Sequence, residues 1–353
     1  MNQLTKRELL SIGAGTIAAG SAGCLDAVSG GSDGETAVQS SFFVLGDFAA
    51  NVAGGAADAD TLVPVGQHGH GWEPSGQLQR DVLTANAFVF MGEGFQPWAD
   101  DIVRNVESDD ANVEVIEARH GIDLLSVDGD HEGHEGHEAD EGGHEADEDD
   151  HTEETGSDDH DGEDNHGGGD GHDHGDVDPH FWLDPTRAAT AVETVREGLV
   201  AVDPENEETY VDNAAAYRER LAELDEAFES ALASASRETV LVAGHNSFQY
   251  LGHRYGFEVH ALTGISPDDS PSQRDILKAQ EAIDHHGVDH VLAPVFESDR
   301  AAEQLVEETD ASEVLPITPI PGQTEAWASD EWGYVEVQEN VNLPSLRAAL
   351  GAE

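Results

Sequence analysis

The sequence predicts an α/β protein with two lobes, each built on a parallel sheet and joined to the other by one long rigid helix. Three observations support this fold class. Short apolar runs alternate with helical segments in the first half of the chain, and the same alternation resumes in the second half. Between the halves, apolar residues recur at three- and four-residue steps, which is typical of one long helix. Strands separated by helices favour parallel sheets covered on both faces.

The first lobe is expected to span residues 38–202. Its predicted strands are short β-prone runs that end at a glycine or a turn, and helical segments lie between them. The expected strands are Ser41–Leu45, Thr61–Val65, Ala87–Met91 and Val113–Ile116, and the expected helices are Gly76–Thr84 and Pro97–Glu107.

Within this lobe, residues 128–178 are predicted to form a disordered insertion. The segment holds 23 acidic residues, nine histidines and no Lys or Arg. It has too little apolar surface to offset the entropy that ordering would cost. An acidic spacer is the plain alternative, but nine histidines among acids and glycines favour contact with metal ions.

Residues 203–236 are predicted to form the helix that links the lobes. Asp203 fits a helix cap, Pro204 the first helical position and Glu205 the positive end of the helix dipole. A helix of about 30 residues would extend about 45 Å, which is longer than one lobe needs. Its expected buried face consists of Tyr210, Ala214, Tyr217, Leu221, Leu224, Phe228 and Leu232.

The second lobe is expected to span residues 237–353 and to repeat the alternation of strands and helices. Its expected strands are Thr239–Ala243, Phe257–Val259, His290–Ala293 and Glu313–Ile317, and its expected helices are Ser247–Tyr255, Ser272–His286 and Arg300–Thr309.

Residues 1–23 have the plan of an export signal, with a basic start, a short apolar stretch and small residues before Cys24. The apolar stretch is too short for a stable membrane span. Ala22–Cys24 resembles a lipobox, so Cys24 would carry a lipid anchor and 24–37 would be a flexible tether. Thr5–Leu10 resembles a twin-arginine export motif with Lys in the first Arg position, which leaves the export route open. A single cysteine excludes an intramolecular disulfide and a Cys-x-x-Cys metal site.

The charge balance excludes some classes of partner. Asp and Glu number 75 against 15 Lys and Arg, a formal net charge of −60, and the chain outside 128–178 still carries −37. Such a field repels nucleic acid and anionic lipid headgroups. An acid excess spread over the whole fold, with only two lysines, is typical of proteins from halophiles, because high salt screens the self-repulsion.

Three histidines outside the insertion lie where a predicted strand has just ended or a turn begins: His70, His180 and His245. In open α/β sheets, ligands bind beyond the carboxyl ends of the strands. Neutral imidazole is a good donor for borderline metal ions, and three imidazoles suit zinc. No His-x-x-x-His or Cys-x-x-Cys spacing joins these residues, and a lone histidine is more often a structural or surface residue than a ligand, so it is their shared placement that favours a metal site.

Several dispersed segments occur in the order seen in a known family. The first, Val63–Pro74, is a Pro-x-Gly turn followed by His, an aromatic residue and Glu-Pro. Three longer segments follow: Gly-Phe-Gln-Pro-Trp at Gly94–Trp98, His-Phe-Trp-Leu-Asp-Pro at His180–Pro185 and His-Asn-Ser-Phe-Gln-Tyr at His245–Tyr250. The last is the Pro-Ser element at Pro271–Ser272. From about Ser41 to the C-terminus, the chain resembles the metal-binding solute-binding proteins of ABC importers for zinc and manganese. A His- and acid-rich insertion before the second histidine is typical of the zinc branch.

The resemblance implies that His70, His180 and His245 bind the metal ion in the cleft between the lobes. A histidine at position 245, where manganese members tend to carry a carboxylate, favours Zn²⁺ over Mn²⁺. Thr318 stands where the family often has Asp, so the fourth ligand stays open.

Four other residues near these motifs are not counted among the ligands. His68 is expected on the surface or behind the ligands. Glu297 could support the cleft, but a buried structural carboxylate is the favoured interpretation. Trp72 and Trp182 are expected to form apolar walls.

The resemblance also implies a function. The protein would capture extracellular zinc and deliver it to an ABC permease and, through it, to the ATPase. It would be a monomer anchored by lipid to the outer face of the cytoplasmic membrane, with no catalytic or cofactor-binding residues. The alternatives are a manganese or iron carrier of the same fold, an extracellular metal buffer that uses only the insertion, and a secreted zinc hydrolase. A hydrolase needs a general base, and no His-Glu-x-x-His motif supplies one.

Overall fold

The computed structural model describes residues 36–69, 72–127, 177–267 and 269–352. The predicted export signal at residues 1–23, Cys24, His70 and residues 128–176 of the predicted insertion lie outside the described residues. Residues 35–353 form one compact unit, and everything below concerns that unit.

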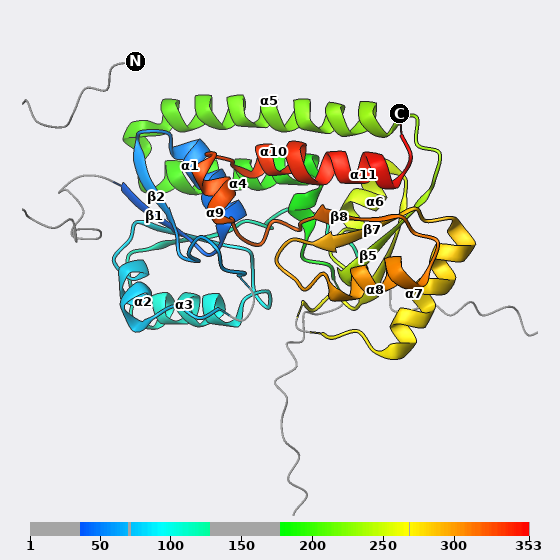
Figure 1. The fold of residues 1–353 in the computed structure, drawn as a ribbon. Helices are drawn as coiled ribbons and strands as arrows, with labels where there is room; N and C mark the ends of the chain where they lie inside the picture. The colour runs from blue at the N-terminus through cyan, green and yellow to red at the C-terminus, as the bar shows by residue number, and fades with distance from the viewer. Residues whose placement is uncertain (1–35, 70–71, 128–176, 268, 353) are drawn as a thin grey trace, which may run out of the picture. The chain divides into compact units, whose positions relative to one another are not determined.

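The first lobe is built on a four-stranded parallel sheet with the strand order β2-β1-β3-β4. Its strands are β1 (Thr36–Ser40), β2 (Ala57–Thr61), β3 (Ala87–Phe90) and β4 (Glu114–Glu117). The helices that accompany this sheet are α1 (Phe43–Ala53), α2 (Gly76–Val82), α3 (Pro97–Ser108) and α4 (Pro185–Val202), and Figure 1 shows them around the blue and cyan strands. All four residues of β3 are buried, as expected for a strand covered on both faces.

The second lobe repeats this design with the strand order β6-β5-β7-β8, again with all pairs parallel. Its elements are β5 (Thr239–His245), α6 (Gln249–Tyr255), β6 (Glu258–Thr263), α7 (Gln273–His286), β7 (His290–Pro294), α8 (Arg300–Glu308) and β8 (Glu313–Ile317). In both sheets the strand order reverses direction beside the first strand. A crevice at that point, beyond the carboxyl ends of the strands, is where such folds bind ligands.

The long helix is α5 (Glu207–Leu232), which follows a 3₁₀ turn, Pro204–Asn206. Figure 1 shows it running along both lobes. Its buried residues are the seven apolar or small residues that the periodicity predicted. Asp203 precedes the 3₁₀ turn and accepts hydrogen bonds from the Tyr210 hydroxyl at 2.7 Å and the Thr36 hydroxyl at 3.0 Å. It therefore ties the start of α5 to β1.

The chain also returns from the second lobe to the first. After β8 come α9 (Glu325–Ser329), α10 (Tyr334–Val337), a π-helical turn (Gln338–Asn342) and α11 (Leu343–Ala349). Helices α10 and α11 lie against α5, and the Tyr334 ring packs edge-on against Phe48 of α1 at 5.4 Å. As a result, one hydrophobic core includes residues from both lobes.

The predicted fold of two parallel-sheet lobes joined by a long helix is confirmed. Two predicted strands are wrong. Ser41–Leu45 lies at the start of α1, because the buried residues Val44, Leu45, Phe48 and Val52 follow the helical repeat. In Thr61–Val65 only Thr61 belongs to a strand, as the last residue of β2; the rest lies in the turn that follows, where Pro64 has no N–H to donate to a sheet. No helix among the described residues is both long enough and apolar enough to cross a bilayer.

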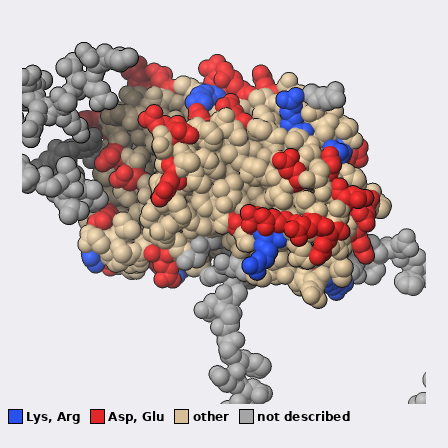
Figure 2. All heavy atoms as spheres, in the orientation of Figure 1, with Lys and Arg blue, Asp and Glu red and all other residues tan. Residues whose placement is uncertain are grey.

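Acidic side chains are scattered over the surface of the described residues, and basic ones are few (Figure 2). Most of the Arg side chains that the structure describes form ion pairs with neighbouring carboxylates, for example Arg254 with Asp225 and Arg220 with Glu336. These pairs leave a large uncompensated negative charge, given that the chain outside 128–178 carries −37.

We predict that the stability of this fold rises steeply with salt. In dilute buffer of about 0.01 M salt the screening length is about 30 Å, so the surface charges repel one another over much of the molecule. Near 1 M salt the screening length falls to about 3 Å and most of this repulsion is removed. Thermal unfolding followed by circular dichroism should give a much higher midpoint in molar KCl than in dilute buffer. Equal midpoints would contradict adaptation to high salt.

Candidate metal centre

A small pocket lies where the carboxyl ends of strands from both sheets meet. The first lobe contributes residues that follow β1, β2 and β3 and the segment before α4, and the second lobe contributes the end of β5 and the residues after β8. The lining residues are Phe42, His68, Gly69, Phe95, Gln96, His180, Trp182, His245, Pro319 and Pro321. Its cavity volume of about 10 Å³ is far below the range of about 300–1,000 Å³ usual for organic ligands, so the pocket suits a single ion.

His180 is fixed by Asp178, two residues before it. One oxygen of Asp178 accepts a hydrogen bond from the His180 backbone N–H at 2.9 Å and lies 2.8 Å from the ring Nδ1. Both side chains are 2% exposed. Because the carboxylate accepts a hydrogen bond from Nδ1–H, the Nε2 atom of His180 is the ring atom that can bind a metal ion.

His245 is the last residue of β5 and is 1% exposed. Its Nδ1 lies 2.5 Å from the Oε1 atom of Glu297, which follows β7. Glu297 therefore does for His245 what Asp178 does for His180: it fixes the ring and leaves Nε2 for a ligand. The sequence suggested a structural carboxylate at Glu297, and the structure adds this contact with a predicted metal ligand.

The two imidazoles face each other across the pocket. Their ring centroids are 5.4 Å apart. Two histidines that share one tetrahedral zinc ion, with Zn–N distances of about 2.0 Å, have centroids about 5 Å apart. In the described part of the chain, Nε2 of His245 and Oε1 of Gln96 are buried and have no hydrogen-bond partner. A buried polar atom without a partner is costly, so these atoms fit a pocket that binds a polar or cationic ligand.

The walls of the pocket supply few other donors. Phe42, Phe95 and Trp182 are apolar, as predicted for Trp182, whereas Trp72 lies outside the lining and packs edge-on against Trp98 at 5.1 Å. On the side of β8, the lining residues are Pro319 and Pro321, whose side chains have no donor atom.

Thr318 and His68 differ in their relation to the pocket. Thr318 is fully buried outside the lining, and its hydroxyl accepts a hydrogen bond from the Ile320 backbone N–H at 2.9 Å. That contact supports a local turn in which Ile320 has a positive φ of 58°. His68, in contrast, lines the pocket and packs edge-on against Phe296 at 6.2 Å.

His70 lies outside the described residues, but its described neighbour Gly69 lines the pocket. In residues 36–69, 72–127, 177–267 and 269–352, no three His, Cys, Asp or Glu side chains are close enough together to hold a metal ion. The structure thus brings together two of the three predicted ligands, His180 and His245.

Asp178 was wrongly assigned to the disordered insertion. Val177 pairs with Ser126, and the Asp178 carbonyl accepts a hydrogen bond from the Tyr250 hydroxyl at 2.7 Å. The Tyr250 oxygen in turn accepts from the Leu125 N–H at 2.9 Å. These contacts fix both chain segments that flank 128–176. The acidic composition hid the role of Asp178, although its position two residues before a candidate ligand was a usable signal.

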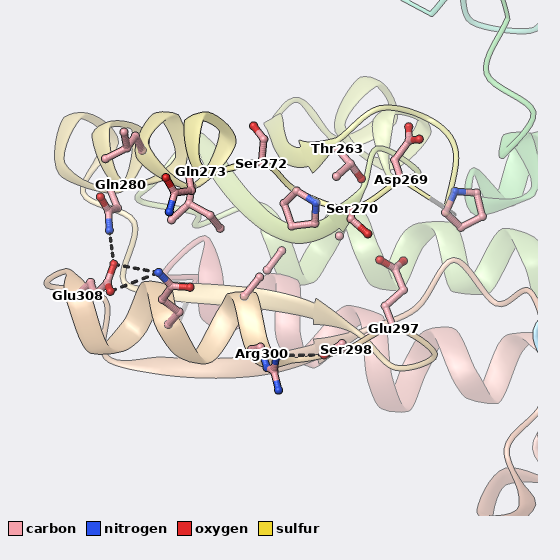
Figure 3. Close-up of a pocket in the computed structure, with 18 of the residues that line it drawn as sticks. Thr263, Asp269, Ser270, Ser272, Gln273, Gln280, Glu297, Ser298, Arg300 and Glu308 are labelled. Atoms are coloured by element: carbon pink, nitrogen blue, oxygen red, sulfur yellow. Dashed lines mark hydrogen bonds between the residues drawn. The ribbon is translucent and has the colours of Figure 1, made fainter. Parts of the chain in front are cut away.

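A second pocket lies between α7 and α8, and Glu297 is among its lining residues (Figure 3). Its carboxylates are Asp269, Glu297 and Glu308, and Glu308 accepts hydrogen bonds from Gln280 and Gln304. No histidine is among its lining residues. Because borderline ions such as zinc favour imidazole, the pocket between the two sheets is the better candidate for the metal centre.

Comparison with known proteins assigns the family. The family model ZnuA, described as zinc-uptake complex component A, periplasmic, matches residues 38–349. The chain belongs to this family. One curated relative is the zinc-binding protein AdcA of Streptococcus pyogenes serotype M3, which is 28% identical over 89% of this chain. Another is the high-affinity zinc uptake system protein ZnuA of Bacillus subtilis, which is 26% identical over 89% of this chain and 87% of that protein. The chain spans only 56% of the length of that AdcA.

Solved structures agree with the fold. The Zn(II)-bound ZnuA-like domain of Streptococcus pneumoniae AdcA matches with a TM-score of 0.67 and 26% identity, over 90% of this chain and 99% of that domain. The AdcAII protein of Streptococcus pneumoniae matches with a TM-score of 0.68 at 24% identity, over 90% of this chain and all of that one, which supports the fold alone.

We predict that Glu297→Gln weakens zinc binding about 10- to 100-fold, the usual effect of losing a carboxylate behind a metal-binding histidine. Glutamine can still accept a hydrogen bond from Nδ1 but lacks the charge that makes the imidazole a stronger donor. Competition against a chromophoric zinc chelator would measure the change. Glu307→Gln, at an exposed position on α8, is the matched control and should behave as the wild type. Equal affinities for all three proteins would contradict this role of Glu297.

Proposed function

We propose that this protein captures zinc outside the cytoplasmic membrane and delivers it to the permease of an ABC importer, and that it is not an enzyme. The observation that carries the proposal is the pair of buried histidines, each with Nδ1 bound to a carboxylate, whose rings are at the separation that a shared zinc ion requires. The family model and the zinc-binding relatives support the same conclusion.

The ligand set that we propose is His70, His180 and His245. His70 is two residues from His68 and next to Gly69, both of which line the pocket. The prolines after β8 bring no carboxylate to the fourth position, so a water molecule or the Gln96 amide oxygen would complete the tetrahedron.

Zinc is favoured over manganese by the donor atoms. Manganese prefers carboxylate and carbonyl oxygens, and the described residues that line the pocket include no carboxylate. The same feature disfavours a zinc hydrolase. A hydrolase needs a general base within hydrogen-bond reach of a metal-bound water, and Asp178 and Glu297 are already bound to the ligand imidazoles.

The remaining features of the proposal concern the whole protein. The relative in Streptococcus pneumoniae strain R6 is named a zinc-binding lipoprotein, which supports a lipid anchor at Cys24 and a location on the outer face of the membrane. An ATPase would act through the permease. We propose a monomer and a halophilic source, on the charge balance alone.

We predict that His180→Ala and His245→Ala each weaken tight zinc binding by more than about 100-fold, since losing a ligand costs more than losing the carboxylate behind it. The matched control is His253→Ala, an exposed histidine on α6, which should keep wild-type affinity. Competition titration with zinc and with manganese measures both affinity and selectivity. Wild-type affinity in His245→Ala would place the tight site elsewhere.

We further predict that the insertion is a weak zinc collector, separate from the tight site. Deleting 128–176 should lower the amount of zinc bound at excess metal and leave one tight site, because ordering a low-complexity segment around an ion would cost conformational entropy and weaken its binding. Deleting 128–178 should damage the tight site as well, because Asp178 fixes His180. Equilibrium dialysis over a range of zinc concentrations separates the two outcomes. Loss of the tight site in the shorter deletion would mean that the insertion holds it.

A further inference from the structure

We propose a second, weaker site for a borderline divalent metal ion at the edge strand of the second lobe, formed by His260 of β6 and His286 at the end of α7. Neither residue belongs to the pocket between the sheets. The two ring centroids are 5.1 Å apart. This is the separation of about 5 Å that two imidazoles adopt around one tetrahedral zinc ion.

The ring atoms are suitably placed for metal binding. The Thr239 hydroxyl lies 3.2 Å from Nδ1 of His286, so Nε2 of that ring is left for a metal ion. Nε2 of His260 lies 3.9 Å from a carboxylate oxygen of Glu258, which places negative charge beside the pair. The pKa of His260 is lowered by burial and by the neighbouring His286, so the ring is neutral and able to bind metal ions at neutral pH.

The pair is open to solvent. The His260 side chain is 42% exposed, and β6 is an edge strand of the second sheet. Both histidines line a groove that also contains His253, Glu238 and Glu258. The positive charge in this groove is Arg237, whose guanidinium is bound to Asp289 at 3.1 Å and to the Gly287 carbonyl at 3.1 Å. The groove therefore attracts cations more than it repels them.

The groove extends toward the pocket between the sheets. Its lining includes Asn246, which follows His245, and Asp178, which fixes His180. An ion held by His260 and His286 would therefore lie in the same groove as Asp178, the carboxylate that fixes His180 in the pocket between the sheets. With two imidazoles and the remaining positions filled by water, the site would bind zinc more weakly than a three-histidine site and would release it readily.

The test is histidine footprinting of the full-length protein with diethyl pyrocarbonate, read by peptide mass spectrometry during a zinc titration. We expect His260 and His286 to become protected over the same zinc range, above the first equivalent, while the exposed His120 on the first lobe reacts throughout. Magnesium at equal concentration should protect neither, because it prefers oxygen ligands. Protection by magnesium would show that the groove attracts any divalent cation by its negative charge, without binding through the imidazoles, and would overturn the proposal.

Two variants test whether one ion is shared. In His260→Gln, protection of His286 should require at least about tenfold more zinc, since a ligand is lost. In the matched variant His253→Gln, which changes another histidine of the same groove, protection of His286 should be unchanged. Circular dichroism melts should be equal for both variants and the wild type. Wild-type protection of His286 in a folded His260→Gln variant would show that the residues do not share an ion.

Discussion

The indole of Trp182 holds the two lobes in the arrangement that the metal pocket requires. It is 1% exposed and packs against Phe42 and Phe95 of the first lobe at 5.3 and 5.8 Å. Its N–H donates to the Pro319 carbonyl of the second lobe at 2.7 Å, and its own carbonyl accepts from the Tyr334 hydroxyl. Truncation would open a cavity and leave buried polar groups without partners. Because His180 is two residues away, this contact sets its distance from His245.

The negative charges of the candidate site are carried by the carboxylates that contact Nδ1 of His180 and His245. In the proposed site, three neutral imidazoles would leave a zinc ion with its full +2 charge, and a buried charge needs compensation nearby. Asp178 and Glu297 would supply it through the Nδ1 atoms of His180 and His245. These two carboxylates orient the rings and would strengthen them as donors and balance the ion, while the described lining of the pocket, which has no carboxylate, favours zinc over harder ions.

Sequence patterns predicted the parts of the fold whose signals are local. The buried face of α5 follows from its helical repeat, and the histidines stand beside recognisable motifs. The failures have physical causes. Ser41–Leu45 is β-prone, but its last three residues begin α1, because burial of one helical face outweighs the β-propensity of a short run. Glu297 is 52 residues from His245, and no local pattern reports such a contact. Asp178 was hidden by the acidic segment that precedes it.

The central claim is that three histidines bind one zinc ion between the lobes. Zinc K-edge X-ray absorption on protein loaded with less than one equivalent of zinc tests it most directly. We expect a shell dominated by three imidazole nitrogens at about 2.0 Å, and fewer in a variant that lacks His180 and His245. A shell of mostly carboxylate oxygens, or an imidazole signal that is unchanged in that variant, would contradict the account.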